Sequence, residues 1–241
     1  MSQLRCDFHI HTTYSDGKCS IPEILELYAR EQFDVIAITD HALDSTSLEV
    51  FEQAGGPPSV TNKNFLDYMH HLEAFRQRAR EQYNLHLIPG LELTNNRDEY
   101  HILALDIQEW IDPNLPVPEL VAQIHRQEGL AVACHPAKKE GVLEQGSYRH
   151  LYEHREHYRD LFDAWEIANR HHLFNSVGLM KMPYLANSDL HHPEHIFSWK
   201  TLLEAEKFNT NSVKNAIRKN DAIAIFLHNK TSRSRQTKSS P

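Results

Sequence analysis

The chain has 241 residues, a length that suits one large α/β domain, and 40% of them are hydrophobic. Its 25 basic and 33 acidic residues give a net charge of −8, which argues against bulk electrostatic binding to nucleic acid or to an anionic membrane. No apolar run approaches the ~18 residues of a membrane span, no leader pattern is visible, and the three cysteines show no CxxC spacing, so we expect a cytoplasmic protein.

The predicted elements alternate between short apolar strands and longer helices. The first helix follows Ser20, a good N-cap, and has Pro22 in its first turn. The strands are expected at 6–10, 34–39, 85–89, 101–106, 130–134, 164–167, 184–186, 199–203 and 223–227. The helices are expected at 21–32, 64–82, 118–127, 146–158, 174–182 and 212–219. This alternation predicts βαβ units and a mainly parallel sheet.

Two stretches fall outside this pattern. Residues 42–61 contain "AGGPPS" and are long for a βα loop, so we expect an irregular lid or substrate loop there. Residues 229–241 are polar and lack acidic side chains, so we expect a disordered tail. The sequence therefore predicts a single domain over 1–228, followed by that tail.

The 18 histidines are the unusual feature of the composition, and they suggest metal or proton chemistry. His9 and His11 end the first strand, and side chains two apart on a strand point the same way, so both imidazoles can reach one point. The other ligand-type residues lie mostly just after strands, and they are Asp16, His41, Glu92, His135, Asp189 and His191, with His101 at the start of a strand. In parallel α/β folds the active site lies at that end of the sheet, so we expect these nine residues to converge.

The metal prediction depends on the whole pattern and not on any single motif. Among 18 histidines, a His-X-His pair is expected about once by chance. Imidazole and carboxylate groups gathered at one sheet edge, without a thiolate, are the N and O donors that suit Zn²⁺, Mn²⁺ or Fe²⁺.

Four blocks in the sequence, "HIH", "TDH", "CHP" and "DLH", occur in an order and spacing that resembles the PHP (polymerase and histidinol phosphatase) family of metal-dependent phosphoesterases. The resemblance extends from Cys6 to His191 and implies a distorted (β/α)7 barrel with up to three metals at its mouth. It assigns one metal to His9, His11 and Asp189, a second to His101 and His135 with Glu92 as the bridge, and a third to Asp16, His41 and His191. A candidate stands at every position, so the resemblance implies two to three divalent ions.

The resemblance also implies hydrolysis of a phosphoester by a metal-bridging hydroxide, with a phosphorylated small molecule or a nucleotide as substrate. Basic residues near strand ends are candidates for phosphate binding, and among Lys138, Lys139, Arg170 and Lys200 we favour Lys138 and Arg170. The alternative for Lys138 is that it forms, with Lys139, a pair of solvated loop lysines. His195, four residues after His191, is a candidate proton donor to the leaving group, and the alternative is a surface histidine.

Three other functions stay open at this point. The first is nuclease or nucleotide phosphodiesterase activity in the same family, although the acidic balance disfavours long nucleic acid. The second is amidohydrolase-type cleavage of C–N bonds, and against it no lysine follows a strand at the matching place. The third is a non-catalytic metal-binding module, against which the full set of candidate ligands speaks.

Overall fold

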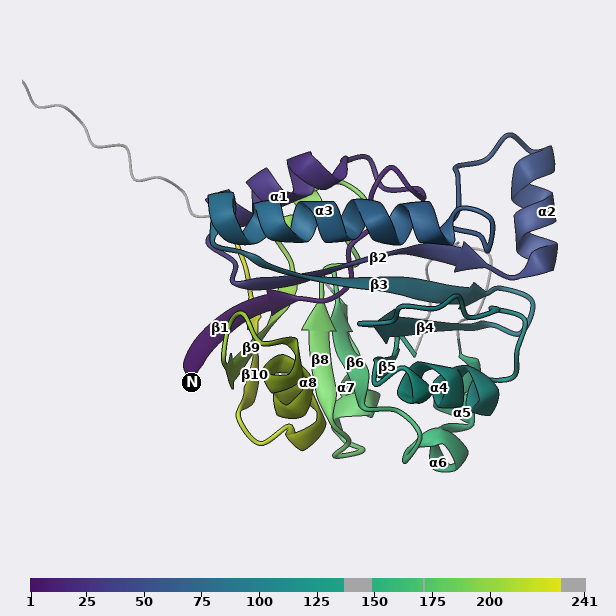
Figure 1. The fold of residues 1–241 in the computed structure, drawn as a ribbon. Coiled ribbons are helices and arrows are strands. Elements are labelled where there is room, and N and C mark those ends of the chain that lie inside the picture. The colour runs from purple at the N-terminus through teal and green to yellow at the C-terminus, as the bar shows by residue number, and fades with distance from the viewer. Residues whose placement is uncertain (137–148, 171, 231–241) are drawn as a thin grey trace, which may run out of the picture.

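A mixed sheet that curls into a distorted barrel forms the centre of the fold. The computed structural model describes residues 1–136, 149–170 and 172–230, and these contain one ten-stranded sheet (Figure 1). Lys138 and residues 231–241 of the predicted tail lie outside the described residues. The strands are β1 (Ser2–Asp7), β2 (Val35–Leu43), β3 (His86–Asn95), β4 (Tyr100–Leu105), β5 (Leu130–Ala133), β6 (Ala164–Asn169), β7 (His172–Leu173), β8 (Tyr184–Asn187), β9 (Trp199–Ala205) and β10 (Ile223–Leu227).

The strand directions differ from the sequence prediction. The order is β10-β9-β1-β2-β3-β4-β5-β6-β7, with β8 beside β6. Pairing is parallel for β1–β2, β2–β3, β5–β6 and β6–β8 and antiparallel for the other neighbours, so the prediction of a mainly parallel sheet is wrong. At β3–β4 the reason is plain: β3 continues to Asn95 and β4 begins at Tyr100. So short a connection makes a hairpin, since a parallel neighbour needs a crossover of roughly a dozen residues.

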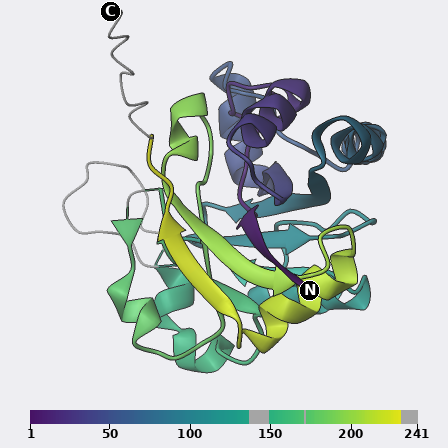
Figure 2. The same ribbon diagram turned by 90° about the vertical axis from the view of Figure 1, so that its left-hand side faces the viewer.

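Two segments far apart in the sequence meet where the barrel closes. The segment after β1 pairs with the segment after β8, because the amide of His11 donates to the Leu190 carbonyl at 2.9 Å and the amide of Leu190 donates to the His9 carbonyl at 3.1 Å. Figure 2 shows the resulting curl of the sheet. The predicted α/β class and distorted barrel are confirmed.

Helices cover the outside of the curl. They are α1 (Ile21–Arg30), α2 (Ser45–Gln53), α3 (Phe65–Tyr83), α4 (Val117–Arg126), α5 (His150–Glu153), α6 (Arg155–Tyr158), α7 (Asn175–Gly178) and α8 (Thr210–Lys219), with a 3₁₀ turn η1 (Pro193–Ile196). Helices α1 and α3 lie beside β2 and β3, and α4 to α6 lie on another side of the sheet (Figures 1 and 2).

Three helical predictions need correction. Residues 42–61 are not wholly irregular, because Asp44 accepts hydrogen bonds from the amides of Thr46 and Ser47, both at 3.0 Å, and thereby caps α2. The helix expected at 146–158 consists, in its described part, of the single turns α5 and α6. The helix expected at 174–182 is limited to the four residues of α7.

The core explains the continuous apolar run of β2. Val35 and Ala37 pack in one buried cluster with Cys6 of β1, whereas Ile36 and Ile38 point to the opposite face and join the cluster that α1 and α3 cover. Both faces of the strand are buried over residues 35–38, so this stretch carries only apolar side chains. Cys6 is fully buried and is a core residue. No helix within the described residues is both long enough and apolar enough to cross a membrane.

Candidate metal centre

The structure brings all nine predicted ligand residues to one mouth of the barrel. His9 and His11 lie just beyond β1, in the segment held against Leu190. His41 and Glu92 stand opposite each other in the register of β2 and β3. His101 lies near the start of β4 and reaches the same place, because β4 runs antiparallel to β3 and pairs His101 with Thr94.

Glu92 lies at the centre of this group. Its carboxylate is buried, and five imidazoles contact it within 3.3 Å. Oε2 faces nitrogens of His9 and His11 at 3.3 Å each and of His41 at 3.0 Å. Oε1 faces His101 at 2.8 Å and His135 at 3.2 Å. Glu92 therefore contacts five of the other eight predicted ligand residues.

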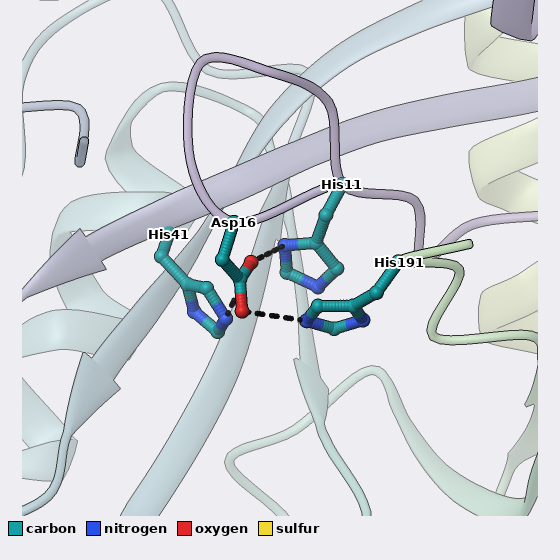
Figure 3. A group of neighbouring side chains, drawn as sticks. All are labelled: His11, Asp16, His41 and His191. Carbon is teal, nitrogen blue, oxygen red and sulfur yellow. Dashed lines mark ion pairs between the residues drawn. The ribbon is translucent and has the colours of Figure 1, made fainter. Parts of the chain in front are cut away.

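A second set of ligand atoms surrounds Asp16. Figure 3 shows Asp16 between His11, His41 and His191, with its oxygens 4.0, 3.6 and 3.1 Å from the nearest nitrogens of those rings. One atom from each of the four residues lies within 4.8 Å of the others, as a metal site requires. The resemblance assigned Asp16, His41 and His191 to one metal, and the structure adds His11 to them.

Two further sets share His9. One contains His9, His11 and Asp189, as the resemblance implied, and the other contains His9, Glu92 and His135. Nδ1 of His101 lies 2.8 Å from Oε1 of Glu92, and His101 belongs to none of the sets found among the described residues. The described side chains therefore form three overlapping sets of possible ligands in one mouth.

Burial and the neighbouring carboxylates have opposite effects on the pKa values of the histidines in the mouth. Burial alone would lower the pKa of His11, but the Asp189 and Glu92 carboxylates outweigh it and raise that pKa to about 9. At His41 burial dominates, and the pKa falls to about 3. Burial would raise the pKa of Glu92, but His9 and His41 hold it well below its usual value. The carboxylates are ionised, so a positive charge must balance them, either as protons or as a cation.

Several buried ligand atoms lack a hydrogen-bond partner among the described residues. They are His9 Nε2, both ring nitrogens of His11, Asp16 Oδ1 and Glu92 Oε2. Buried polar atoms are normally satisfied, because leaving one unpaired costs about 1–3 kcal/mol. These atoms converge on the same mouth, and they are imidazole nitrogens and carboxylate oxygens. The residues therefore fit divalent transition metals.

The turn that carries Asp16 is held in place by hydrogen bonds to Asp40, a residue that the sequence prediction missed. Asp40 is buried and accepts hydrogen bonds from the amide of Thr12 at 2.7 Å, the hydroxyl of Thr12 at 2.8 Å and the hydroxyl of Ser15 at 2.6 Å. Gly17 completes the turn, because a Cβ there would lie 2.4 Å from the carbonyl carbon of His11. Asp40 is the middle residue of "TDH", and its place in a buried strand was the available signal.

The structure describes two of the three residues that were predicted to bind substrate or donate a proton, Arg170 and His195. Arg170 lies at the mouth, where its Nη2 is 3.2 Å from Oδ2 of Asp189. Nδ1 of His195 accepts a hydrogen bond from the amide of His191 at 3.2 Å, and burial together with Arg170 lowers the pKa of His195 to about 4. This disfavours an imidazolium acid. Lys138 lies outside the described residues, and the side chain of Lys200 is fully buried, out of reach of a substrate.

The comparison with known families agrees with this geometry. A family model described as the PHP domain matches residues 7–208. The chain belongs to the PHP family. The resemblance inferred from the four histidine blocks is thereby confirmed, and the His, Asp and Glu clusters of this PHP protein could bind the metals on which the family depends.

Solved structures with low sequence identity share the PHP fold. A two-domain protein from Bacteroides vulgatus, which contains a predicted PHP-like metal-dependent phosphoesterase, has a TM-score of 0.65 at 19% identity over 94% of this chain and 65% of its own. PsfC from Pseudomonas syringae has a TM-score of 0.60 at 14% identity, over 94% of this chain and 92% of its own. The lesion-specific endonuclease EndoQ from Pyrococcus furiosus has a TM-score of 0.57 at 16% identity, over 94% of this chain and 58% of its own.

Proposed function

We propose that this PHP protein is a metal-dependent phosphoesterase that hydrolyses a phosphorylated small molecule or a nucleotide, with two to three Zn²⁺, Mn²⁺ or Fe²⁺ ions. The observation that carries the proposal is the overlap of three ligand sets through His9 and His11 in one mouth. Ions held side by side in such a mouth supply Lewis acidity and a nucleophile at neutral pH for an in-line displacement at phosphorus.

The side chains of the mouth bind and orient the phosphate ester. Glu92, Asp16 and Asp189 are acidic and would repel a phosphate in the metal-free protein, so substrate binding depends on cations at these ligands. The guanidinium of Arg170 stands at the rim beside Asp189 and is about one-third exposed, within reach of a phosphoryl oxygen. Arg170 therefore remains the proposed phosphate-binding residue of the described mouth.

The cysteines support a proposal for the compartment. Cys6, Cys19 and Cys134 are all free thiols and all buried. Reduced, unpaired cysteines are typical of a reducing compartment. We therefore propose a cytoplasmic location, with detection of the tagged protein by cell fractionation as the test.

A substrate panel tests the proposed activity. The protein is stripped with chelator, reloaded with Zn²⁺, Mn²⁺ or Fe²⁺, and assayed against phosphomonoesters, nucleotides, short oligonucleotides and cyclic amides. Turnover of monoesters or nucleotides supports the proposal. Cleavage of oligonucleotides alone would indicate the nuclease alternative, and cleavage of amides alone the amidohydrolase alternative. A metal-loaded protein that turns over none of them would be a binding module.

The matching variants are Asp189→Asn and Asp160→Asn. Both replace a carboxylate by an amide of the same shape, but Asp189 lies in a ligand set and Asp160 is exposed. We expect the Asp189 variant to lose at least about 100-fold in turnover and the Asp160 variant to keep it. Equal activity of the two variants would remove Asp189 from the site.

A further inference from the structure

Glu166 of β6 has a buried carboxylate that four N–H groups surround. Oε1 accepts from Nδ1 of His9 and from Nδ2 of Asn187, both at 2.9 Å. Oε2 accepts from the amide of His135 at 2.7 Å and from Nδ2 of Asn169 at 3.0 Å. A carboxylate offers about four lone-pair sites, so these four donors saturate it. None is left for a metal, and Glu166 belongs to none of the ligand sets.

The first consequence concerns the tautomer of His9. An ionised carboxylate only accepts hydrogen bonds, so Nδ1 of His9 must carry the proton that points at Glu166. In the neutral ring that a metal ion requires, Nε2 then carries its lone pair toward the mouth, where it lies 3.3 Å from Oε2 of Glu92 and 3.5 Å from Oδ1 of Asp189. Nε2 of His9 is also one of the buried atoms without a hydrogen-bond partner among the described residues.

The second consequence concerns the backbone of His135. This residue has φ of 23°, a value that side chains with a Cβ rarely adopt. Its amide donates to Glu166, and with the backbone in this conformation Nε2 of its ring lies 3.2 Å from Oε1 of Glu92. One carboxylate thus fixes two members of the set that His9, Glu92 and His135 form.

We propose that Glu166 is a positioning residue of the metal centre, which presents Nε2 of His9 and the ring of His135 to one ion without touching ion or substrate. The proposal rests on the proposed metal centre. Partners of this kind fix ring orientation and typically account for 10- to 100-fold in metal affinity.

The variant Glu166→Gln tests this without a change of shape. An amide nitrogen in place of Oε1 would face the Nδ1–H of His9, which could pair only by moving its proton to Nε2 and losing the lone pair toward the mouth. An amide nitrogen in place of Oε2 would face the amide of His135 instead. Asn169→Ala is the matched control, because it removes one donor of the same buried carboxylate but touches neither His9 nor His135.

The experiment measures Zn²⁺ affinity and stoichiometry of the full chain by competition with a chromophoric chelator, and folding by circular dichroism. We expect Glu166→Gln to weaken one Zn²⁺ site 10- to 100-fold and Asn169→Ala to change it less than about threefold. Wild-type affinity in a folded Glu166→Gln protein would overturn the proposal, as would equal losses in both variants. A wild-type protein that takes up no metal would instead refute the proposed function.

A second measurement needs no variant. In the Zn²⁺-loaded wild-type protein, ¹⁵N-edited NMR of the histidine side chains reports which ring nitrogen of His9 carries the proton. We expect a proton on Nδ1 that exchanges slowly with water, because it is buried against Glu166. A His9 ring that carries its proton on Nε2 would overturn the proposal even if the variant failed to fold.

Discussion

Nη2 of Arg170 lies 3.2 Å from Oδ2 of Asp189, and Nε of the same guanidinium donates to the Asp189 backbone carbonyl at 3.3 Å. Both residues have a positive φ, 49° in each case, at the ends of neighbouring strands. Arg170 therefore stands beside the carboxylate that faces His9 and His11, with its open side toward solvent.

This position makes Arg170→Gln a test of phosphate binding. A charge-assisted hydrogen bond to a phosphoryl oxygen contributes about 1.5–3 kcal/mol, so we expect KM for a phosphomonoester to rise at least about tenfold at saturating metal, with a smaller change in kcat. The control is Arg97→Gln, at an exposed arginine of the β3–β4 turn that pairs with Asp98. Unchanged KM in the Arg170 variant would assign this side chain to the support of Asp189 alone.

Glu92 offers a direct test of the shared centre. Five imidazoles contact its carboxylate, so Glu92→Gln removes a negative charge that all of them share. We expect the variant to lose at least one bound ion per chain, measured by elemental analysis after purification without chelator. The exposed Glu49→Gln serves as the control. A full complement of metal in the Glu92 variant would contradict its central role.

A buried ion pair lies beneath the centre. Nζ of Lys200 is 3.4 Å from Oδ2 of Asp7, and both side chains are fully buried. Replacing one partner leaves an uncompensated charge in the core, so we expect Lys200→Met to lower the free energy of unfolding by about 3–5 kcal/mol in urea denaturation of the metal-free protein.

The double variant Asp7→Asn with Lys200→Met separates charge from packing. It removes both charges together, so we expect it to be more stable than Lys200→Met alone. The single variant Asp7→Asn is measured beside them. If the double variant lost as much free energy of unfolding as Asp7→Asn and Lys200→Met lose when added together, the pair would not be coupled.

His86 predicts a pH dependence of stability away from the mouth. Its Nε2 lies 3.0 Å from the Thr210 hydroxyl, and burial, together with Arg76, lowers its pKa to about 4. A histidine in the unfolded chain titrates near 6.5, so below that pH the unfolded state binds a proton that the folded state does not. This contribution to stability is therefore complete above pH 6.5 and is lost as the pH falls toward 4.

We expect this loss to be roughly 2–3 kcal/mol between pH 7 and pH 4. The measurement compares urea unfolding of the wild type and of His86→Gln across that range. Because glutamine does not titrate, the variant should show a shallower decline of stability with acid. Parallel curves for the two proteins would contradict the assigned pKa.

The sequence predicted the gathering of ligands well, because the strands that most of the ligands follow, β1, β2, β3, β5 and β8, all run in the same direction and end at one edge of the sheet. His101 was placed at the start of a strand, apart from the other ligands. Its presence in the mouth is explained only by the antiparallel direction of β4. Strand direction is set by connection length, and the prediction ended the preceding strand at residue 89 although β3 continues to Asn95.

The supporting acids were harder to predict. Asp40 and Glu166 lie inside buried strands, where their positions show no ligand-like spacing. A carboxylate in an otherwise apolar strand must have donors around it, but the sequence does not say which ones. Their partners come from distant segments, as with Asn187 for Glu166, and only the closed barrel brings these together.

The bridge between Ile10 and Leu190 also has a consequence for how the protein folds. His9 and His11 flank Ile10, and Asp189 precedes Leu190. The His9, His11 and Asp189 set is therefore assembled only by contacts between residues far apart in sequence. Contacts of this kind form late and slow the folding of a chain. During synthesis, a ribosome-bound chain that has not yet reached residue 189 lacks that set. Binding of a metal ion at the His9, His11 and Asp189 set would therefore show that the barrel has closed.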